Sequence, residues 1–268
     1  MTIKQEHTAI NRLKTLNSTP QSGIKLAFSG GKDSVVLFFL AQKAGISFDA
    51  VYQNTTIDPP GTLSFIRKNF PSVIIQNPKL SFYQLIEKKG LPTRQRRWCC
   101  QYLKENTNKG YKFLLTGVRR NESFKRSEYK IVGYRPNKIV EVRPIIDWND
   151  NDVWEYIQTN DLPVIKYYND PYNFTRHGCV MCPLAYYKQS IREAILFPRY
   201  LKAIIKATRK FREKNTAAEW YNDYADEYEM VYLWLRQELG KRGQRKINNN
   251  LFEFNAKQVL ETFFDCKL

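Results

Sequence analysis

A six-residue segment, SGGKDS at residues 29–34, constrains the fold of this chain more than any other feature. The apolar run at 23–28 before it has the pattern of a buried parallel strand, and the apolar run at 35–43 after it predicts a buried helix. Two adjacent glycines, Gly30 and Gly31, allow the backbone to turn sharply and to approach a ligand closely. The segment is therefore expected to form a tight turn between a strand and a helix.

A turn of this kind attracts phosphate, because the first amides of the following helix are unpaired donors at the positive end of the helix dipole. Lys32 adds a cation, and Ser29 and Ser34 add hydroxyl groups. Asp33 either caps the helix or helps to hold a Mg²⁺ ion that is bridged to phosphates. The spacing is not that of a Walker motif, so the segment predicts a different phosphate-binding loop, with an ordinary capped glycine turn as the alternative.

Four more apolar runs predict strands, and helical patterns lie between them. This alternation predicts an α/β fold with a doubly wound, mainly parallel sheet. In such a sheet the carboxyl ends of the strands line the ligand crevice, so polar residues at these ends are placed to bind a nucleotide. The alternatives are an ordinary turn after the predicted strand at 48–53 and a solvated basic loop after the predicted strand at 113–117. The predicted strands are 48–53, 73–77, 113–117 and 140–148, and the nucleotide-binding candidates at their ends are Asn54, Thr55, Thr56, Gly117, Arg119 and Glu122.

Three regions are expected along the chain. Residues 1–20 predict an amphipathic N-terminal helix without chemistry of its own. Residues 21–185 hold the nucleotide-binding α/β domain together with a four-cysteine site, and residues 186–268 predict a helical C-terminal extension.

Lys and Arg outnumber Asp and Glu by 43 to 26, which gives a formal net charge of +17. A charge so far from neutral predicts a polyanionic partner, and nucleic acid is the natural candidate. The alternative is that part of the charge serves nucleotide phosphates and the rest serves solubility. No apolar run approaches the roughly 18 residues of a membrane span, and the first residues lack a signal-peptide pattern, so a cytoplasmic location without membrane contact is expected.

Five cysteines in a cytoplasmic chain argue against a disulfide framework and for metal or redox chemistry. Four of them form two pairs, and four thiolates are the number that closes a tetrahedral site. An iron–sulfur cluster, a zinc ion and a redox-active or structural set of thiols are the open alternatives. The four are Cys99 and Cys100, which are adjacent, and Cys179 and Cys182, which have Cys-x-x-Cys spacing.

Three arginines, Arg94, Arg96 and Arg97, come immediately before the first cysteine pair. Guanidinium groups suit phosphate or sulfate, and their positive charge also favours the thiolate form of neighbouring cysteines. The segment therefore predicts an anion or substrate site next to the metal ligands. His177, close to the second pair, is expected to be a hydrogen-bonding neighbour rather than a ligand.

Residues 29–34 resemble the pyrophosphate-binding loop of the ATP pyrophosphatase, or PP-loop, superfamily, whose members adenylate a substrate or bind an adenylated one. The segment GVR at 117–119, followed by Glu122 and Ser123, resembles a nucleotide-binding segment of the phosphoadenosine phosphosulfate reductase-like family. The resemblance covers roughly residues 23–183. It implies an adenine nucleotide alpha hydrolase-like, Rossmann-like fold that binds ATP or an adenylyl-sulfate nucleotide.

The segment after the second strand departs from this family. The family usually carries Asp-Thr-Gly there, followed by a Pro, Glu, Thr triplet, whereas Asn54 stands here in place of the Asp, Thr56 in place of the Gly and Gly61 in place of the Glu. The resemblance therefore does not fix the exact substrate.

The cysteine pattern is similar to that of assimilatory sulfonucleotide reductases and of the related DNA-phosphorothioation enzymes. These proteins hold a [4Fe–4S] cluster with a Cys-Cys dipeptide and a later Cys-x-x-Cys. The resemblance implies that the four paired cysteines bind such a cluster in preference to zinc.

The first hypothesis for the reaction is an adenylating enzyme of sulfur metabolism. The loop would bind ATP with Mg²⁺, and an acceptor oxygen, with nucleic acid as the candidate acceptor, would be adenylated with release of pyrophosphate. Lys32, Asp33 and Arg119 are the expected catalytic residues, because cations at this place stabilise charge that develops on the phosphates. Sulfur delivered by a cysteine desulfurase or a persulfide partner would then displace AMP.

The second hypothesis is a reductase of adenylyl or phosphoadenylyl sulfate that releases sulfite. It would use Cys266 as the nucleophile and a thioredoxin-like reductant. In true sulfonucleotide reductases this cysteine lies in a Glu-Cys-Gly-(Leu/Ile)-His segment, whereas Asp265 and Lys267 flank Cys266 here. The third hypothesis is a nucleic-acid-binding module that keeps the loop without catalysis.

Overall fold

The computed structural model of the chain describes residues 3–16, 23–105, 108, 110–135, 138–216, 223–240 and 255–264. The chain forms two compact units, and each unit draws on several segments. The first consists of Met1–Asn54, Pro59–Asn77 and Asn106–Gly178, and the second of Thr55–Asp58, Pro78–Glu105 and Cys179–Leu268. The division into three consecutive regions remains a prediction.

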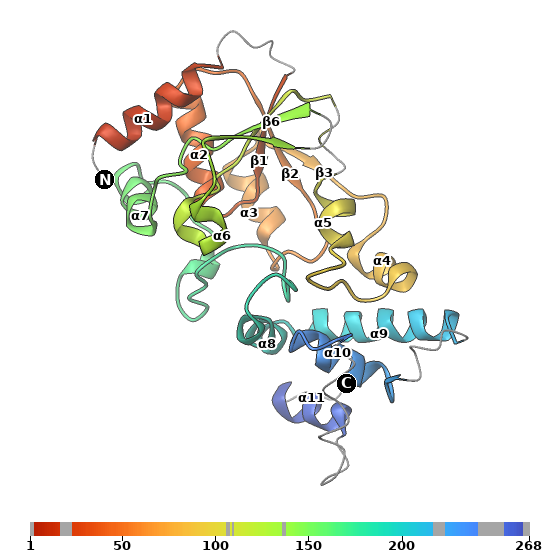
Figure 1. Cartoon of the computed structure of the whole chain (residues 1–268). Helices are drawn as coiled ribbons and strands as arrows, with labels where there is room; N and C mark the ends of the chain where they lie inside the picture. The colour runs from red at the N-terminus through yellow and green to blue at the C-terminus, as the bar shows by residue number, and fades with distance from the viewer. Residues whose placement is uncertain are drawn as a thin grey trace. The chain divides into compact units, whose positions relative to one another are not determined.

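One six-stranded sheet belongs to the first unit (Figure 1). Its order is β3-β2-β1-β4-β6-β5, so the chain winds outward from β1 in both directions. All neighbouring strands are parallel except β5, which is antiparallel to β6. The doubly wound, mainly parallel sheet that the sequence predicts is confirmed. The strands are β1 (Ile24–Phe28), β2 (Asp49–Gln53), β3 (Ile74–Gln76), β4 (Phe113–Leu115), β5 (Val132–Arg135) and β6 (Ile139–Val142).

The core of the first unit lies around β1 and α2 (Lys32–Lys43). Helix α2 carries apolar side chains on nearly every face, and a helix of this kind must be buried. Phe28 of β1 packs against Phe38 of α2 with the ring centroids 5.7 Å apart. Leu37 is fully buried, which contributes about 1.5–3 kcal/mol to the stability of the fold. This packing fixes the first turn of α2 at the carboxyl end of β1.

Helices α1 and α7 pack against α2 beside the sheet (Figure 1). The N-terminal helix expected within residues 1–20 is found as α1, and residues 17–20 lie outside the described residues. Helix α7 begins with a capping box in which Asn149 and Asp152 exchange hydrogen bonds. The helices of this unit are α1 (Ile3–Lys14), α2, α3 (Thr62–Asn69), α6 (Phe124–Ser127) and α7 (Asp150–Thr159), with short 3₁₀ turns at Arg120–Glu122 and Lys166–Tyr168.

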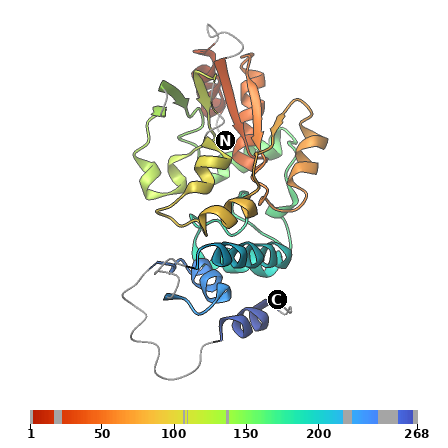
Figure 2. The same ribbon diagram turned by 90° about the vertical axis from the view of Figure 1, so that its right-hand side faces the viewer.

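The described part of the second unit is mainly helical, and its longest helix is α9 (Pro198–Lys214). Helix α9 packs against α4, α8 and α10, and its pairing with α10 is visible in Figure 2. Helices α8 to α10 confirm the helical C-terminal extension. No helix among the described residues combines the length and the apolar character that a membrane span requires. The other helices of this unit are α4 (Phe82–Lys89), α5 (Trp98–Leu103), α8 (Tyr187–Leu196), α10 (Glu227–Leu235) and α11 (Ala256–Phe264).

The sequence does not predict β5, because three of its four residues are exposed and leave no apolar run to detect. A buried carboxylate joins this edge strand to β6. Glu141, which is 1% exposed, accepts hydrogen bonds from Arg135 Nε and Arg143 Nη2, both at 2.6 Å, and from Thr116 Oγ1 at 2.9 Å.

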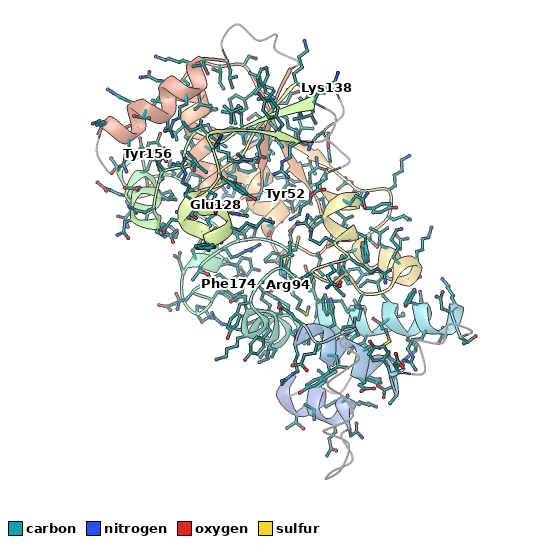
Figure 3. The ribbon with its side chains drawn as sticks, viewed as in Figure 1. Tyr52, Arg94, Glu128, Lys138, Tyr156 and Phe174 are labelled. Atoms are coloured by element: carbon teal, nitrogen blue, oxygen red, sulfur yellow. The ribbon has the colours of Figure 1, made fainter. Side chains whose placement is uncertain are left out.

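We expect the substitution Glu141→Ala to lower the free energy of unfolding by about 3–5 kcal/mol, because Arg143 is buried and loses its counter-charge. Urea titration at neutral pH measures the change. The matched control is Glu128→Ala, since Glu128 is exposed (Figure 3) and should change stability by less than about 0.5 kcal/mol.

We expect the stability difference between the wild type and Glu141→Ala to depend on pH. Burial alone raises the pKa of Glu141, but the hydrogen bonds and charges of Arg135 and Arg143 outweigh it and hold the pKa below the ordinary value of 4.5. The ionised carboxylate therefore stabilises the fold above pH 4.5, and this contribution is lost as the pH falls through the lower pKa of the folded state. The stability difference between the wild type and Glu141→Ala should narrow on acidification, and a difference that stays constant would contradict the assignment.

Candidate active site

The segment at 29–34 joins β1 to α2, and its two glycines lie where a side chain would not fit. Gly30 has a φ of +75°, in the left-handed region, and a Cβ there would lie 3.3 Å from the side chain of Ile66. A Cβ on Gly31 would lie 3.1 Å from the hydroxyl of Tyr168. Gly30 is therefore needed for the path of the backbone at the end of β1, and a side chain at Gly31 would require its neighbour Tyr168 to shift by a few tenths of an ångström.

The two serines of the segment bond to the loop itself. Ser34 Oγ donates to the carbonyl of Gly31 at 2.8 Å, and Ser29 Oγ accepts from the amide of Gly31 at 3.3 Å. The two hydroxyl oxygens are 3.1 Å apart. These contacts show that Ser29 and Ser34 shape the loop, whereas their predicted role as ligands of phosphate remains a prediction.

The first turn of α2 presents backbone donors. The amide of Lys32 donates to Tyr168 Oη at 3.0 Å. Within the described residues, the amides of Asp33 and Ser34 donate to no protein acceptor, and the N-cap residue Gly31 offers no side chain to cap them. Such donors at the positive end of the helix dipole bind an anion.

Two cations and two carboxylates meet at this turn. Lys32 is 5% exposed, and its Nζ donates to the carbonyl of Thr175 at 3.0 Å and lies 3.4 Å from Asp150 Oδ1. Arg119 is 2% exposed and bonds through Nε to Asp33 Oδ1 at 2.7 Å and through Nη2 to Asp150 Oδ1 at 2.8 Å. We call Lys32, Asp33, Arg119 and Asp150 the charge cluster. Its formal charges cancel, which is how two nearly buried cations are tolerated.

The pKa values of two groups beside the loop, Asp150 and Tyr168, are shifted in opposite directions. Burial alone raises the pKa of Asp150, but the charges of Lys32 and Arg119 outweigh it and hold the pKa below its ordinary value. Asp150 is therefore a carboxylate at neutral pH. Burial raises the pKa of Tyr168 well above its ordinary value, so its hydroxyl keeps its proton. The hydroxyl can therefore still donate a hydrogen bond while it accepts one from Lys32.

Gly117, at the end of β4, lets that strand approach α2. A Cβ at this position would lie 2.9 Å from the carbonyl oxygen of Asp33, which is a backbone atom and cannot rotate away. The end of the predicted strand at 113–117 is therefore in contact with the first turn of α2.

Other predicted nucleotide-binding residues have different surroundings. Asn54 Nδ2 donates to Asn77 Oδ1 at 2.9 Å, and Glu122 forms an ion pair with Arg126. Thr55 and Thr56 belong to the second unit. Their role in nucleotide binding remains a prediction.

Three parts of the site are not predicted from the sequence: Asp150, Tyr168 and the carbonyl of Thr175. Asp150 had a weak signal, since it follows the helix cap at Asn149. No sequence signal marks Tyr168 and Thr175, because they are 136 and 143 residues away from Lys32 in the sequence and contact it only in the folded protein. His177, expected as a hydrogen-bonding neighbour, has its Nε2 3.3 Å from Thr62 Oγ1.

The four paired cysteines belong to the second unit, and all four thiols are free and half-buried. Cys99 and Cys100 lie in the first turn of α5. Cys179 Sγ donates to Thr55 Oγ1 at 3.5 Å. Cys266 lies outside the described residues, so its role as a nucleophile remains a prediction.

The four thiols influence one another's ionisation. A hydrogen bond to Cys100 and burial raise the pKa of Cys99, and the charges of Cys100, Cys179 and Cys182 raise it further. The same hydrogen bond lowers the pKa of Cys100 to about 6, against the effect of burial and with help from Lys104. Cys100 is therefore the more acidic of the two adjacent thiols.

The donor set fits an iron–sulfur cluster or zinc in number and in chemistry. Burial raises the pKa of Cys179 to about 11, and the Lys104 ammonium opposes this rise, as a cation beside metal-bound thiolates would. The described residues, however, contain no group of three or more His, Cys, Asp or Glu side chains arranged to hold a metal ion. The cofactor is therefore a proposal.

The three predicted anion-binding arginines also belong to the second unit. Arg94, labelled in Figure 3, donates through Nη2 to the carbonyl of Ala185 at 3.1 Å. Arg96 donates to the carbonyl of Lys89 at 3.2 Å. Arg97 is the N-cap residue of α5, and its charge helps to lower the pKa of Cys100.

A doubly wound sheet, a glycine-rich loop at the end of β1 and a buried lysine in the first turn of α2 define an α/β protein with a candidate phosphate-binding loop. The chain belongs to the phosphoadenosine phosphosulfate reductase domain family, whose sequence profile matches residues 23–185.

Individual proteins are also similar to this chain. An uncharacterized protein of Methanocaldococcus jannaschii is 31% identical over 223 residues, which cover 78% of this chain and 53% of that protein. The adenosine 5'-phosphosulfate reductase of Oceanobacillus iheyensis is 29% identical over 171 residues, covering 59% of this chain and 70% of the reductase. The chain spans about half the length of its two M. jannaschii relatives.

Among solved structures, the phosphoadenylyl-sulfate reductase of Candida auris, determined as a phosphate complex, has a TM-score of 0.51 and 18% identity to this chain. The match covers 67% of this chain and 96% of the reductase. This similarity shows the fold.

We expect Gly117→Ala to weaken binding of an adenine nucleotide by about 10- to 100-fold, because the added methyl group displaces the first turn of α2. Calorimetric titration with ATP and Mg²⁺ and with adenylyl sulfate measures the change. The control is Gly178→Ala, where the added Cβ meets only the flexible end of Arg176 at 3.2 Å. Equal affinities for the two variants would contradict the role assigned to Gly117.

In reduced, metal-free protein, iodoacetamide should alkylate Cys100 before the other three paired cysteines, because its pKa is lowered to about 6. Its rate should rise as the pH passes through that value and then level off. Cys99→Ala removes the main cause of the shift and should slow labelling of Cys100 at neutral pH several-fold, whereas Cys182→Ala should not. Peptide mass spectrometry measures the rates, and faster labelling of Cys99 than of Cys100 would contradict the assignment.

Proposed function

We propose that the chain is a PP-loop enzyme of sulfur metabolism that binds ATP with Mg²⁺ at residues 29–34 and adenylates an acceptor, with nucleic acid as the acceptor class. The observation that carries this proposal is the charge cluster at the N-terminus of α2. It combines the cations that bind phosphates with carboxylates that suit a hard divalent cation.

The carboxylates favour ATP over a sulfonucleotide. A triphosphate carries more negative charge than an adenylyl sulfate, and its enzymes hold that charge with Mg²⁺ as well as with lysine and arginine. The side chain of Asp150 is 61% exposed, so it is accessible to a metal ion. Within the described residues, its Oδ2 accepts no hydrogen bond. Without a cation, two carboxylates beside a phosphate site would oppose binding.

The reaction follows from the parts of the site. An acceptor hydroxyl or carbonyl oxygen attacks the α-phosphorus, the bond from that phosphorus to the bridging oxygen breaks, and pyrophosphate leaves with the electron pair. Lys32 and Arg119 stabilise the charge on the phosphoryl oxygens, and the amides of Asp33 and Ser34 hold the pyrophosphate in place. The terminal sulfur of a persulfide on a cysteine desulfurase partner then attacks the acceptor atom that carries the adenylated oxygen, and AMP leaves with that oxygen. The product is a disulfide between the acceptor and the partner's cysteine. A dithiol reductant supplies the two electrons that cleave this disulfide and release the thiolated acceptor.

We further propose that Cys99, Cys100, Cys179 and Cys182 bind a [4Fe–4S] cluster. Four free thiols in one unit, as an adjacent pair and a Cys-x-x-Cys pair, supply the number and the kind of ligands that such a cluster requires. When bound, the cluster would supply a sulfur-binding or structural centre, and zinc is the alternative. Loading with iron and sulfide without oxygen should protect all four thiols from iodoacetamide.

A second candidate function is reduction of adenylyl or phosphoadenylyl sulfate. Relatives named adenosine 5'-phosphosulfate reductase favour it, since one is 29% identical over 171 residues. In this reaction a cysteine thiolate attacks the sulfate sulfur, the bond from that sulfur to the phosphate oxygen breaks, and AMP or its 3'-phosphorylated form leaves. A thioredoxin-like dithiol then reduces the resulting S-sulfocysteine, which releases sulfite and oxidises the dithiol to a disulfide. Cys266 is the candidate nucleophile.

One assay separates the two functions. Purified protein is incubated under anaerobic conditions with ATP and Mg²⁺, with adenylyl sulfate or with phosphoadenylyl sulfate. Each incubation is done with and without single-stranded RNA or DNA, and pyrophosphate and sulfite are measured in the same sample. The proposal expects nucleic-acid-dependent pyrophosphate release from ATP. Sulfite release without pyrophosphate, abolished in Cys266→Ser, would establish the second function instead.

We expect Lys32→Ala to lower the rate of pyrophosphate release by about 10²–10³-fold, because it removes a preorganised cation from the phosphate site. The matched control is Lys43→Ala at the other end of α2, where the exposed lysine pairs with Glu6. Thermal unfolding of both variants checks that the fold is kept. An unchanged rate in Lys32→Ala would contradict the role of the charge cluster.

A further inference from the structure

The second unit contains a cavity of about 660 Å³ that the proposed reaction does not use. Three segments of this unit line it: the turn after α4, the start of α8, and the helices α9 and α10 with the residues that follow α10. The volume suits a ligand of the size of one nucleotide, because small-molecule sites usually measure about 300–1,000 Å³.

The cavity is positively charged. Lys89, Arg94, Arg96 and Arg236 line it, and no Asp or Glu is among the described residues of its lining. Arg236 is partly offset by Glu238, which accepts from its Nε at 3.1 Å. The lining therefore attracts an anion.

Aromatic side chains form much of the remaining wall. Tyr186 is 60% exposed, and its ring centroid lies 4.8 Å from that of Tyr187 at an interplanar angle of 65°. Phe211 and Trp234 are buried and form the deeper part. An exposed tyrosine beside arginines offers a face on which a base can stack and cations for the adjoining phosphate.

Hydrogen bonds hold these walls in place. Trp234 Nε1 donates to the carbonyl of Pro92 at 2.6 Å, and Arg94 donates to the carbonyl of Ala185. Gly90 has a φ of +73°, and a Cβ there would lie 2.6 Å from the ring of Phe211, so this glycine lets the chain pass the aromatic wall. The cavity is therefore preformed rather than a gap between loose segments.

We propose that this cavity binds one unstacked nucleotide of a single-stranded nucleic acid, with the base against Tyr186 and the phosphates beside Arg96 and Arg236. The proposal deepens the proposed function and rests on it for the acceptor class. A polymer is favoured over a free nucleotide because Tyr186 faces solvent and the chain carries a net charge of +17, which contributes to binding through further phosphates.

The test measures the fluorescence anisotropy of labelled oligouridylate and oligothymidylate of about 12 nucleotides, a length within the usual site sizes of single-strand binding proteins. We expect Tyr186→Ala to weaken binding about 5- to 100-fold and Tyr186→Phe to keep it, because stacking needs the ring and not the hydroxyl. Arg96→Gln should weaken binding and reduce its salt dependence by about one phosphate contact, whereas Arg96→Lys should keep the salt dependence. The comparison of RNA with DNA identifies the kind of strand.

The control for charge is Arg199→Gln, which removes an exposed arginine at the start of α9 that does not line the cavity. Binding that is equal in the wild type, Tyr186→Ala and Arg96→Gln overturns the proposal. It is also overturned if AMP competes as strongly as the oligonucleotide, or if a duplex binds as tightly as a single strand.

This inference and the proposed function fail separately. Lys32→Ala should lose pyrophosphate release and keep its affinity for the oligonucleotide. Cavity-dependent binding without pyrophosphate release in the wild type would contradict the proposed function alone. Nucleic-acid-dependent pyrophosphate release that Tyr186→Ala leaves unchanged, with unchanged affinity, would contradict this inference alone.

Discussion

The geometry of the candidate site depends on the two ion pairs of Arg119. This residue follows β4, and its guanidinium group bonds to Asp33 in the first turn of α2 and to Asp150 at the start of α7. One planar side chain thus joins three segments that are distant in the sequence, with donors in a fixed arrangement that a lysine does not reproduce. Because only 3% of the side chain is exposed, loss of either carboxylate would leave a nearly buried charge uncompensated. Lys32 lies within the same network and is held by it.

The sequence predicts the parts of the fold that local patterns encode. The apolar runs give β1 and α2 because both are buried. The paired glycines give the turn between them because Gly30 has a left-handed backbone and Gly31 is closely packed. Strand β5 escapes prediction because its side chains face solvent and need not be apolar. Tyr168 and Thr175 escape it for another reason: their contacts with Lys32 depend on tertiary folding, and no residue near them in the sequence marks them as part of the site.

One departure from the family in the segment after β2, Thr56, has a structural account. Thr56, which stands where the family has glycine, has a φ of +61°, so the left-handed backbone is kept without the residue that favours it. A β-branched residue in this conformation costs about 1–2 kcal/mol. Its hydroxyl accepts from the amide of Phe82 at 2.8 Å, at the start of α4, which offsets part of that cost. Since the preceding Thr55 accepts from Cys179, the segment contributes to the surroundings of the cysteines.

Because the charges of the charge cluster cancel, an anion that binds the loop has to replace a carboxylate partner of Lys32 or Arg119. Lys32 and Arg119 already have carboxylate partners, so a phosphate that arrives without a metal must exchange with Asp33 or Asp150 rather than meet an unoccupied cation. When a phosphate arrives with a divalent cation, the cation can bind the carboxylates while the phosphate binds Lys32 and Arg119, so no charged group loses its partner. Under the proposed function, the overall charge of the protein attracts many anions, whereas the loop selects those that bring a counter-ion.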